Sequence, residues 1–170
     1  LLPVDSPGQE QKSQWLQIRR DKPDYVIMWG WGVMNAVAIQ EAANIRFPMD
    51  KFIGIWWSGS EADVKPAGVA AKGYKSAQIT GTGTGAPLHA QIRDLVFAKG
   101  KGMGQDTFGE VLYNRGIVNA AIMIEAVRTA QGKFGKKPLT GEQVQWGFEN
   151  LNITQEMIDK LGLTGLMSPI

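Results

Sequence analysis

The sequence predicts an α/β protein in which parallel strands alternate with helices. In residues 24–35, a continuous apolar run passes through Gly30 and Gly32 directly into helical periodicity, as in a buried parallel strand that feeds a crossover helix. Residues 51–56 form a second apolar run that also ends in tryptophan. Ligands of open α/β sheets bind beyond the carboxyl ends of the strands, so the aromatic residues at these two ends are candidate ligand contacts.

The composition indicates a globular protein and excludes several kinds of site. The formal net charge is +2, and no run of five like charges occurs, so we expect no nucleic-acid binding. The absence of cysteine excludes disulfides, iron–sulfur clusters, cysteine-ligated zinc and a cysteine nucleophile. No apolar stretch approaches the roughly 18 residues of a membrane span. Because the chain starts at Leu1 without methionine, we expect it to be part of a longer protein.

Helices and strands alternate through the first half of the chain. Ser6, Pro7 and Gln9 have the pattern of a helix start with a capping box, and Pro23 is expected to end that helix. The next helix follows Gly32 and runs to about Asn44. The segments expected after it are a strand at 51–56, a short helix capped by Ser58 with Glu61, and a third strand at 73–79.

The second half is mostly helical. The glycine-rich segment 80–85 is the sharpest change in composition, and we interpret it as a domain boundary or hinge. From Val111 onward, an almost completely apolar helix predicts a buried element that ends at Gly132 and Gly135. The other expected segments are an amphipathic helix at 87–99, a flexible loop at 100–109, a helix opened by the capping box at 140–143, and a last helix capped by Thr154 and ending at Gly162.

No motif predicts catalysis, a metal or a cofactor. Gly30-Trp31-Gly32 resembles the start of a dinucleotide fingerprint, but Asn35 replaces the third glycine and Trp31 would obstruct a pyrophosphate. The segment 81–85 lacks the Gly-Lys-Ser/Thr ending of a phosphate loop. His89, the single histidine, has no nucleophile elbow to serve, so we expect a surface or half-buried side chain. Glu61 and Asp63 have no further ligand at metal-binding spacing.

Four tryptophans lie near the predicted strand ends and favour a small-molecule pocket lined by aromatic side chains. Trp29 and Trp31 point the same way along an extended backbone, whereas Trp56 and Trp57 point to opposite faces. Trp29 and Trp56 precede the turns, so they favour the core. Trp31 and Trp57 lie beyond the strand ends, so they favour ligand contact.

Several short motifs, in this order, resemble those of the branched-chain amino acid type of ABC-transporter substrate-binding protein. The motifs are Gln17-Ile18-Arg19, Lys22-Pro23-Asp24-Tyr25-Val26, Gly30-Trp31-Gly32, Lys72-Gly73-Tyr74, Tyr113-Asn114-Arg115-Gly116, Thr140-Gly141-Glu142-Gln143-Val144 and Trp146-Gly147.

The resemblance implies a type I periplasmic-binding-protein (flytrap) fold, with parallel sheets flanked by helices in two lobes that close on a ligand. Such proteins are longer than this chain, are not enzymes and have no cofactor. Residues 1–79 look like part of the C-terminal lobe, and residues 80–170 look like the return segment of the N-terminal lobe, with a hinge near 80–85. The implied protein is periplasmic or lipid-anchored, and its partners are a small-molecule ligand and an ABC permease in the membrane.

The resemblance also implies ligand-binding residues. Trp31 matches the contacting aromatic of the family, and Tyr113 or Arg115 matches a second contacting segment. The family's acidic residue for a ligand ammonium falls on Trp56 or Trp57, which leaves Glu61 as the alternative anchor. We therefore expect an apolar or aromatic carboxylate stacked on Trp31 and Trp57, with Arg115 or a helix N-terminus at the acid and with the glycines near Trp31 leaving room for it.

Two alternative functions stay open, the first on the same flytrap fold and the second on a doubly wound α/β fold. One is a ligand-sensing module of a receptor or regulator, for which a fused DNA-binding or transmembrane segment would be the sign. The other is an enzyme that uses a nucleotide cofactor, which would need a phosphate-gripping loop.

Overall fold

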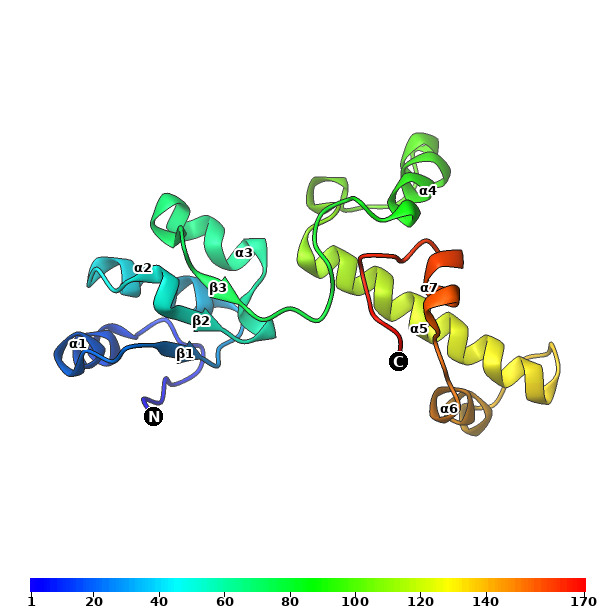
Figure 1. Ribbon diagram of the computed structural model, residues 1–170, viewed down its shortest axis with the longest axis horizontal. Helices are drawn as coiled ribbons and strands as arrows, with labels where there is room; N and C mark the ends of the chain where they lie inside the picture. The colour runs from blue at the N-terminus through cyan, green and yellow to red at the C-terminus, as the bar shows by residue number, and fades with distance from the viewer. The chain divides into compact units, whose positions relative to one another are not determined.

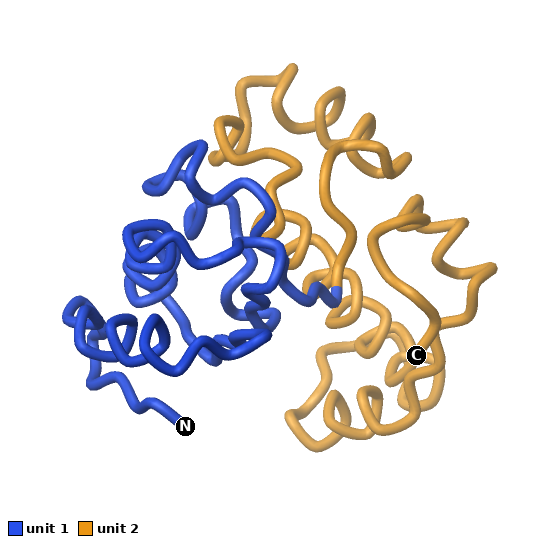
Figure 2. Tube along the Cα trace, turned by 60° about the vertical axis from the view of Figure 1, so that its left-hand side comes forward, with its two compact units in different colours: residues 1–79 blue, residues 80–170 orange.

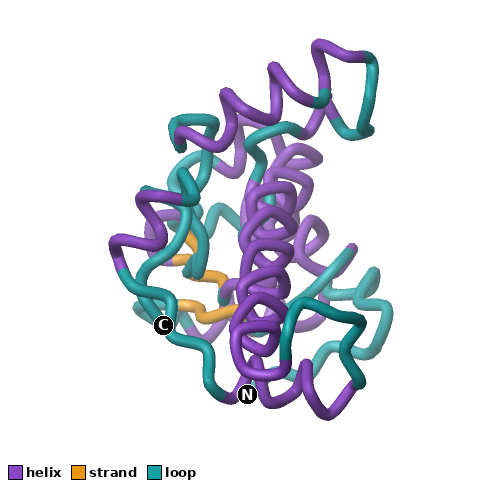
Figure 3. The backbone as a smooth tube through the Cα atoms, turned by 90° about the vertical axis from the view of Figure 1, so that its right-hand side faces the viewer, coloured by secondary structure: helices purple, strands orange, loops and turns teal.

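The computed structural model describes residues 1–170, and the chain divides into two compact units, Leu1–Ile79 and Thr80–Ile170 (Figure 2). All of the strands belong to the first unit, whereas the second unit consists of helices and loops (Figures 1 and 3). The boundary coincides with the change in composition at residue 80. The assignment of the units to lobes, and of 80–85 to a hinge, stays a prediction.

The first unit alternates helices and strands. Its elements are α1 (Lys12–Asp21), β1 (Val26–Met28), α2 (Val33–Asn44), β2 (Phe52–Gly54), α3 (Glu61–Val64) and β3 (Lys75–Ser76), with 3-10 turns at Met49–Lys51, Trp56–Ser58 and Lys65–Ala71. The strands form one sheet in the order β1-β2-β3, and both pairs are parallel. The predicted α/β class with a parallel sheet is therefore confirmed.

One face of the sheet packs into the core of the first unit. Val26 is paired in register with Phe52, and both belong to a cluster with Trp15 of α1 and Ile39 of α2. The rings of Trp15 and Phe52 meet edge to face with their centroids 5.1 Å apart, a geometry that adds to the burial of apolar area. This cluster fixes both helices against the sheet.

The expectation that β1 is a buried strand is wrong. β1 lies at the edge of the sheet, and the side chain of Ile27 is 74% exposed because nothing covers the face opposite the core. An apolar run specifies burial of a strand only when both neighbouring layers are present.

Two predicted helix starts are displaced. α1 begins at Lys12 rather than next to Ser6, with Gln11 at its N-cap and the Gln11 Nε2 donating to Gly8 O and Met34 O. α3 is capped by Ser60 and Asp63 instead of Ser58 and Glu61. Each of these segments contains several residues that could cap a helix. Tertiary contacts then select the residue that does so.

The second unit is organised around the long helix α5. Its elements are α4 (Pro87–Leu95), α5 (Val111–Phe134), α6 (Gly141–Glu149) and α7 (Gln155–Lys160), with 3-10 turns at Phe97–Lys99 and Gln105–Thr107. Side chains of Val118, Ile153, Ile158 and Leu163 form its core. The predicted caps at Thr140 and Thr154 are confirmed, since both hydroxyls accept a backbone N–H from the third helical residue.

The prediction that α5 is buried all round is wrong. Leu112, Met123 and Ile124 are exposed on one side of the helix, whereas α6 covers part of the other side. Gly132 lies inside α5, which continues to Phe134. α6 comes close because Gly147 has no side chain: a Cβ there would stand 2.2 Å from Ala126 O. No helix of the structure combines the length and apolarity that crossing a membrane requires.

Candidate functional site

Three tryptophans gather at the carboxyl ends of β1 and β2. The rings of Trp29 and Trp57 meet edge to face with centroids 6.5 Å apart, and those of Trp56 and Trp57 are 4.6 Å apart and tilted by 52°. We call Trp29, Trp56 and Trp57 the aromatic cluster. The expectation that Trp56 and Trp57 point to opposite faces is wrong, because they lie in a 3-10 turn and not in an extended strand.

The prediction for Trp29, a member of the aromatic cluster, is wrong. Trp29 was expected in the core, yet 78% of its side chain is exposed, since it follows the last residue of an edge strand. Together with Trp57, which is also exposed, it presents aromatic surface to solvent. Aromatic side chains exposed at this edge of a parallel sheet lie where ligands of such sheets bind.

Trp31 stands in the turn that joins β1 to α2, and 68% of its side chain is exposed. The next residue, Gly32, has a φ of 59° that a residue with a Cβ rarely adopts, and it occupies the N-cap of α2. No side chain caps α2, and its first turn holds no acidic residue. The N-terminus of α2, with its positive end of the helix dipole, is therefore available to an anionic group beside Trp31.

A buried polar network holds the loops beneath the aromatic cluster. Asn35 Nδ2 donates to Trp57 O at 2.9 Å and to Asp63 Oδ1 at 3.1 Å. Ser58 Oγ donates to Gly30 O at 2.7 Å, and Tyr74 OH donates to Ser58 O at the same distance. These bonds tie the turn after β1 to the turn after β2, so they fix the backbone that carries the tryptophans. Sequence reasoning missed the network, although polar residues directly after apolar strands are a usable signal for it.

Of the acidic residues near the aromatic cluster, Asp63 is hydrogen-bonded within the protein and Glu61 is half-buried. Asp63 Oδ2 accepts from the N–H and the hydroxyl of Ser60 at 2.9 and 2.8 Å, and its other oxygen accepts from Asn35. Glu61, the predicted alternative anchor for an ammonium group, is the half-buried first residue of α3. Burial, with the negative charge of Asp63 as the smaller cause, raises the pKa of the Tyr74 hydroxyl well above its ordinary value of 10.0.

Gly30 makes room for a protein group. A Cβ at Gly30 would stand 2.5 Å from Asn35 Oδ1, an oxygen that is buried without a hydrogen-bond partner. This overturns the expectation that Gly30 leaves space for a ligand; at Gly32, by contrast, a Cβ would meet open space.

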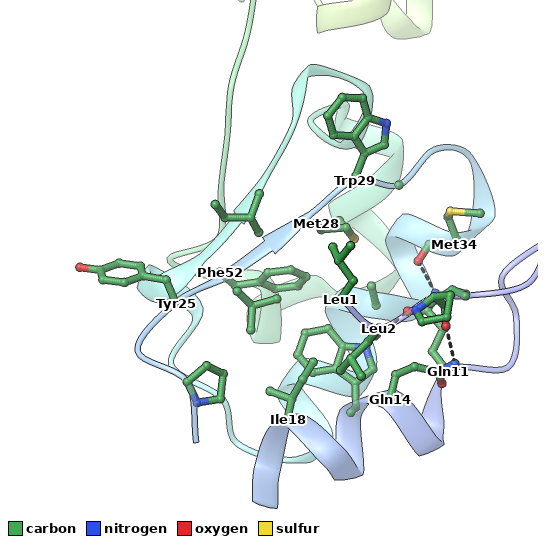
Figure 4. Close-up of a pocket in the computed structure, with 18 residues that line it drawn as sticks. Leu1, Leu2, Gln11, Gln14, Ile18, Tyr25, Met28, Trp29, Met34 and Phe52 are labelled. Atoms are coloured by element: carbon green, nitrogen blue, oxygen red, sulfur yellow. Dashed lines mark hydrogen bonds between the residues drawn. The ribbon is translucent and has the colours of Figure 1, made fainter. Parts of the chain in front are cut away.

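A groove of about 440 Å³ lies beside β1 (Figure 4). Core side chains such as Trp15, Met28 and Phe52 line it together with Leu1 and Leu2 of the N-terminal segment. Only Trp29 connects it with the aromatic cluster. Its lining comes largely from the core, so we interpret the groove as uncovered core and place the candidate ligand site at the strand ends.

The predicted residues Tyr113 and Arg115 belong to the second unit, in the first turns of α5. Both side chains are half-buried. The Tyr113 ring packs edge to face on Phe108 with centroids 5.2 Å apart, and Phe108 also contacts His89 and Phe97. The ring contacts therefore hold Tyr113 in one orientation. Its role and that of Arg115 in ligand binding stay predictions.

His89 is fully buried, so the expected surface or half-buried position is wrong. Its Nε2 lies 2.8 Å from Oδ1 of the equally buried Asn114. An amphipathic helix pattern places a residue on a face, but the polar partner that makes burial of His89 favourable comes from another helix. The structure holds no group of three or more His, Cys, Asp or Glu side chains that could bind a metal ion.

Comparisons with known proteins give a consistent family and fold. A family described as periplasmic binding protein matches residues 2–165. A solved structure described as an ABC transporter permease from the Pseudomonas fluorescens group is 45% identical, with a TM-score of 0.91 over 99% of this chain. No curated protein matches the chain.

Two more distant structures show the fold alone. A branched-chain amino acid ABC transporter protein from Thermus thermophilus with bound valine is 22% identical, with a TM-score of 0.67 over 86% of this chain. A solute-binding protein of an ABC transporter from R. palustris in complex with benzoate is 16% identical, with a TM-score of 0.60 over 88%. The chain spans 41%, 37% and 38% of the lengths of these three proteins.

Proposed function

The chain belongs to the periplasmic binding protein family, and from this premise we propose that it forms part of the solute-binding component of an ABC importer. In this role the protein works outside the cytoplasm, either free in the periplasm or lipid-anchored, and delivers its ligand to a permease in the membrane. The proposed ligand is a small carboxylate with an apolar or aromatic body. Trp31 and the aromatic cluster hold the body, and the N-terminus of α2 meets the acid.

The observation that carries the proposal is the exposed aromatic surface at the carboxyl ends of β1 and β2. Trp29, Trp31 and Trp57 are all exposed there, although each would bury a large apolar area if covered. The polar network under the loops keeps this surface in place without a ligand. A preorganised aromatic wall of this kind lowers the entropy that ligand binding costs.

The charges near the site favour an acid over an ammonium group. Asp63 is fully engaged by Ser60 and Asn35, and α2 offers an N-terminus without a competing side-chain cap. Valine and benzoate, the ligands of the two distant structures, share a carboxylate joined to an apolar group. Trp56 and Trp57 occupy the predicted place of an ammonium anchor, so we expect a simple acid to bind more tightly than an amino acid.

The test is a thermal-shift and calorimetric titration of the full-length protein with benzoate, phenylacetate, 4-methylvalerate, valine and leucine. We expect the three simple acids to raise the melting temperature, because a ligand that binds only the folded state stabilises it by mass action. Stabilisation by valine or leucine and by none of the acids would contradict the proposed ligand class.

Variants locate the site. Trp31→Ala and Trp57→Ala should each weaken the best acid at least about 10-fold, since each removes a stacking surface. Tyr25→Ala is the matched control: Tyr25 is an exposed aromatic residue just before β1, at the opposite end of the strand from the aromatic cluster. Equal losses from all three variants would place the ligand elsewhere.

A further inference from the structure

Ser58 lies between the two turns that carry the tryptophans. It follows Trp57 directly, and its side chain is fully buried. Its Oγ donates to Gly30 O at 2.7 Å, and Gly30 separates Trp29 from Trp31 along the chain. One residue therefore belongs to the backbone of the turn after β2 and holds the backbone of the turn after β1.

Three further contacts keep Ser58 itself in place. Its N–H donates to Ile55 O at 2.8 Å within the 3-10 turn, and its carbonyl oxygen accepts from Tyr74 OH at 2.7 Å. Gly54 packs closely on both side chains, since a Cβ there would stand 2.8 Å from Ser58 Cβ and 1.9 Å from Tyr74 OH. A hydroxyl supported in this way fixes the position of the turn to which it donates.

The contact between the rings of Trp29 and Trp57 spans the same two turns. Their centroids are 6.5 Å apart, and both side chains are exposed, so burial contributes little to holding them. Asn35 supports the turn after β2 through its bond to Trp57 O. The bond from Ser58 to Gly30 O is the one that reaches the backbone between Trp29 and Trp31.

We infer that Ser58 is a positioning residue that determines the ligand specificity of this site, an inference that rests on the proposed function. By fixing Gly30, the Ser58 hydroxyl sets the distance between Trp31 and Trp57, and this distance limits the thickness of a ligand body that contacts both rings. A fixed distance discriminates between a flat aromatic body and a branched aliphatic one, whereas a loose surface repacks around either. Ser58 is buried, so it acts through the two turns and not by touching the ligand.

Circular dichroism in the near ultraviolet tests the positioning role on the full-length protein without ligand. The signal depends on the geometry of the Trp29 and Trp57 rings, and Trp29→Phe measures how much that ring contributes. We expect Trp29→Phe to change the spectrum at least about two-fold less in Ser58→Ala than in the parent, since a Gly30 O without its donor lets the turn move. Equal changes in the two backgrounds overturn the positioning role.

Titration with benzoate and 4-methylvalerate, a flat acid and a branched one, tests the specificity role. We expect the parent to prefer one of the two acids by at least about 10-fold, and Ser58→Ala to reduce this preference to about 3-fold or less. General destabilisation would weaken both acids equally and leave their ratio unchanged. A preference that is absent from the parent, or unchanged in Ser58→Ala, overturns the specificity role.

Ser60→Ala is the matched control. The Ser60 hydroxyl donates to Asp63 Oδ2 at 2.8 Å and does not join the two turns, and the Ser60 N–H still holds Asp63 after the substitution. This variant should keep both the preference between the acids and the spectral change caused by Trp29→Phe. Equal effects of Ser58→Ala and Ser60→Ala would show general loosening of the loops and would overturn the inference.

Failure of the parent to bind any acid would contradict the proposed function, and the spectra without ligand would still decide whether Ser58 sets the geometry of the rings. If Ser58→Ala does not fold, Tyr74→Phe takes its place, because it removes the donor to Ser58 O. Tyr74→Phe should reduce the preference between the acids in the same direction. An unchanged spectrum and an unchanged preference in Tyr74→Phe would then overturn the inference.

Discussion

Each unit contains one fully buried asparagine, and the two are held in different ways. Asn114 in the second unit uses both ends of its amide, with three carbonyl oxygens around Nδ2 and His89 at Oδ1. Asn35 in the first unit donates to Trp57 O and Asp63, but its Oδ1 has no partner. A buried amide fixes its surroundings in proportion to the hydrogen bonds that it completes.

The two units therefore differ in how firmly hydrogen bonds hold the backbone around the buried asparagine. In the second unit, Asn114 holds the segment around Gly81 and Gly83 because its amide hydrogen-bonds to their carbonyl oxygens. The first unit keeps an unsatisfied oxygen, Asn35 Oδ1, next to the Gly30 turn. This oxygen is buried, so the amide of Asn35 holds its surroundings with hydrogen bonds from one end only.

The largest expected effect is a difference between two truncations. Asn114→Ala should destabilise the second unit by about 3 kcal/mol, because it leaves buried backbone carbonyls and the His89 Nε2 without their partner, whereas Asn35→Ala should cost the first unit about 1 kcal/mol. Denaturant unfolding measures both, with circular dichroism reporting on the helical second unit and tryptophan fluorescence mainly on the first. Equal losses of stability in the two variants would contradict this difference between the units.

Tight packing in the second unit can be probed away from Asn114. Gly147→Ala should cost about 2 kcal/mol, because the new Cβ would stand 2.2 Å from Ala126 O and would push α6 away from α5. Gly132→Ala is the control: Gly132 lies inside α5 with open space around it. That variant should stabilise the helix by about 0.5–1 kcal/mol. Thermal unfolding followed by circular dichroism distinguishes the two outcomes.

The smallest expected effect is a dependence of the first unit's unfolding free energy on pH. The pKa of Tyr74 is raised above 10.0 in the folded state, chiefly by burial. The stabilisation from this hydroxyl is therefore complete below pH 10 and is lost as the pH rises above 10 toward the folded pKa, because only the unfolded chain releases the proton. The side chain is partly exposed, so the loss should stay below about 1 kcal/mol per pH unit.

Tyr74→Phe checks the origin of this pH dependence. Its unfolding free energy should be lower than that of the parent at pH 7, since Ser58 O loses the donor at 2.7 Å. Between pH 10 and 11 the difference between the two proteins should shrink. If the unfolding free energies of the parent and of Tyr74→Phe change equally with pH in that range, the pKa of Tyr74 is not raised.

Features that depend on neighbouring residues along the chain could be predicted from the sequence. The strand–turn–helix unit at β1 and α2 and the caps at Thr140 and Thr154 follow from apolar periodicity and capping chemistry. The parallel α/β class follows from the repetition of that unit. The change in composition at residue 80 coincides with the boundary between the two units for a similar reason, since a glycine-rich segment cannot continue either core.

Which layer covers each face of a strand or helix depends on contacts between distant parts of the chain. Apolar periodicity shows that Ile27 and the outer side of α5 prefer burial, but not whether a neighbouring layer is present, and in this structure both are exposed. Likewise, the burial of His89 and the fixed position of Gly81 depend on Asn114, which is brought to them by folding. Contacts between residues distant in sequence supply these hydrogen bonds, so local pattern could not have predicted which parts of the chain they fix.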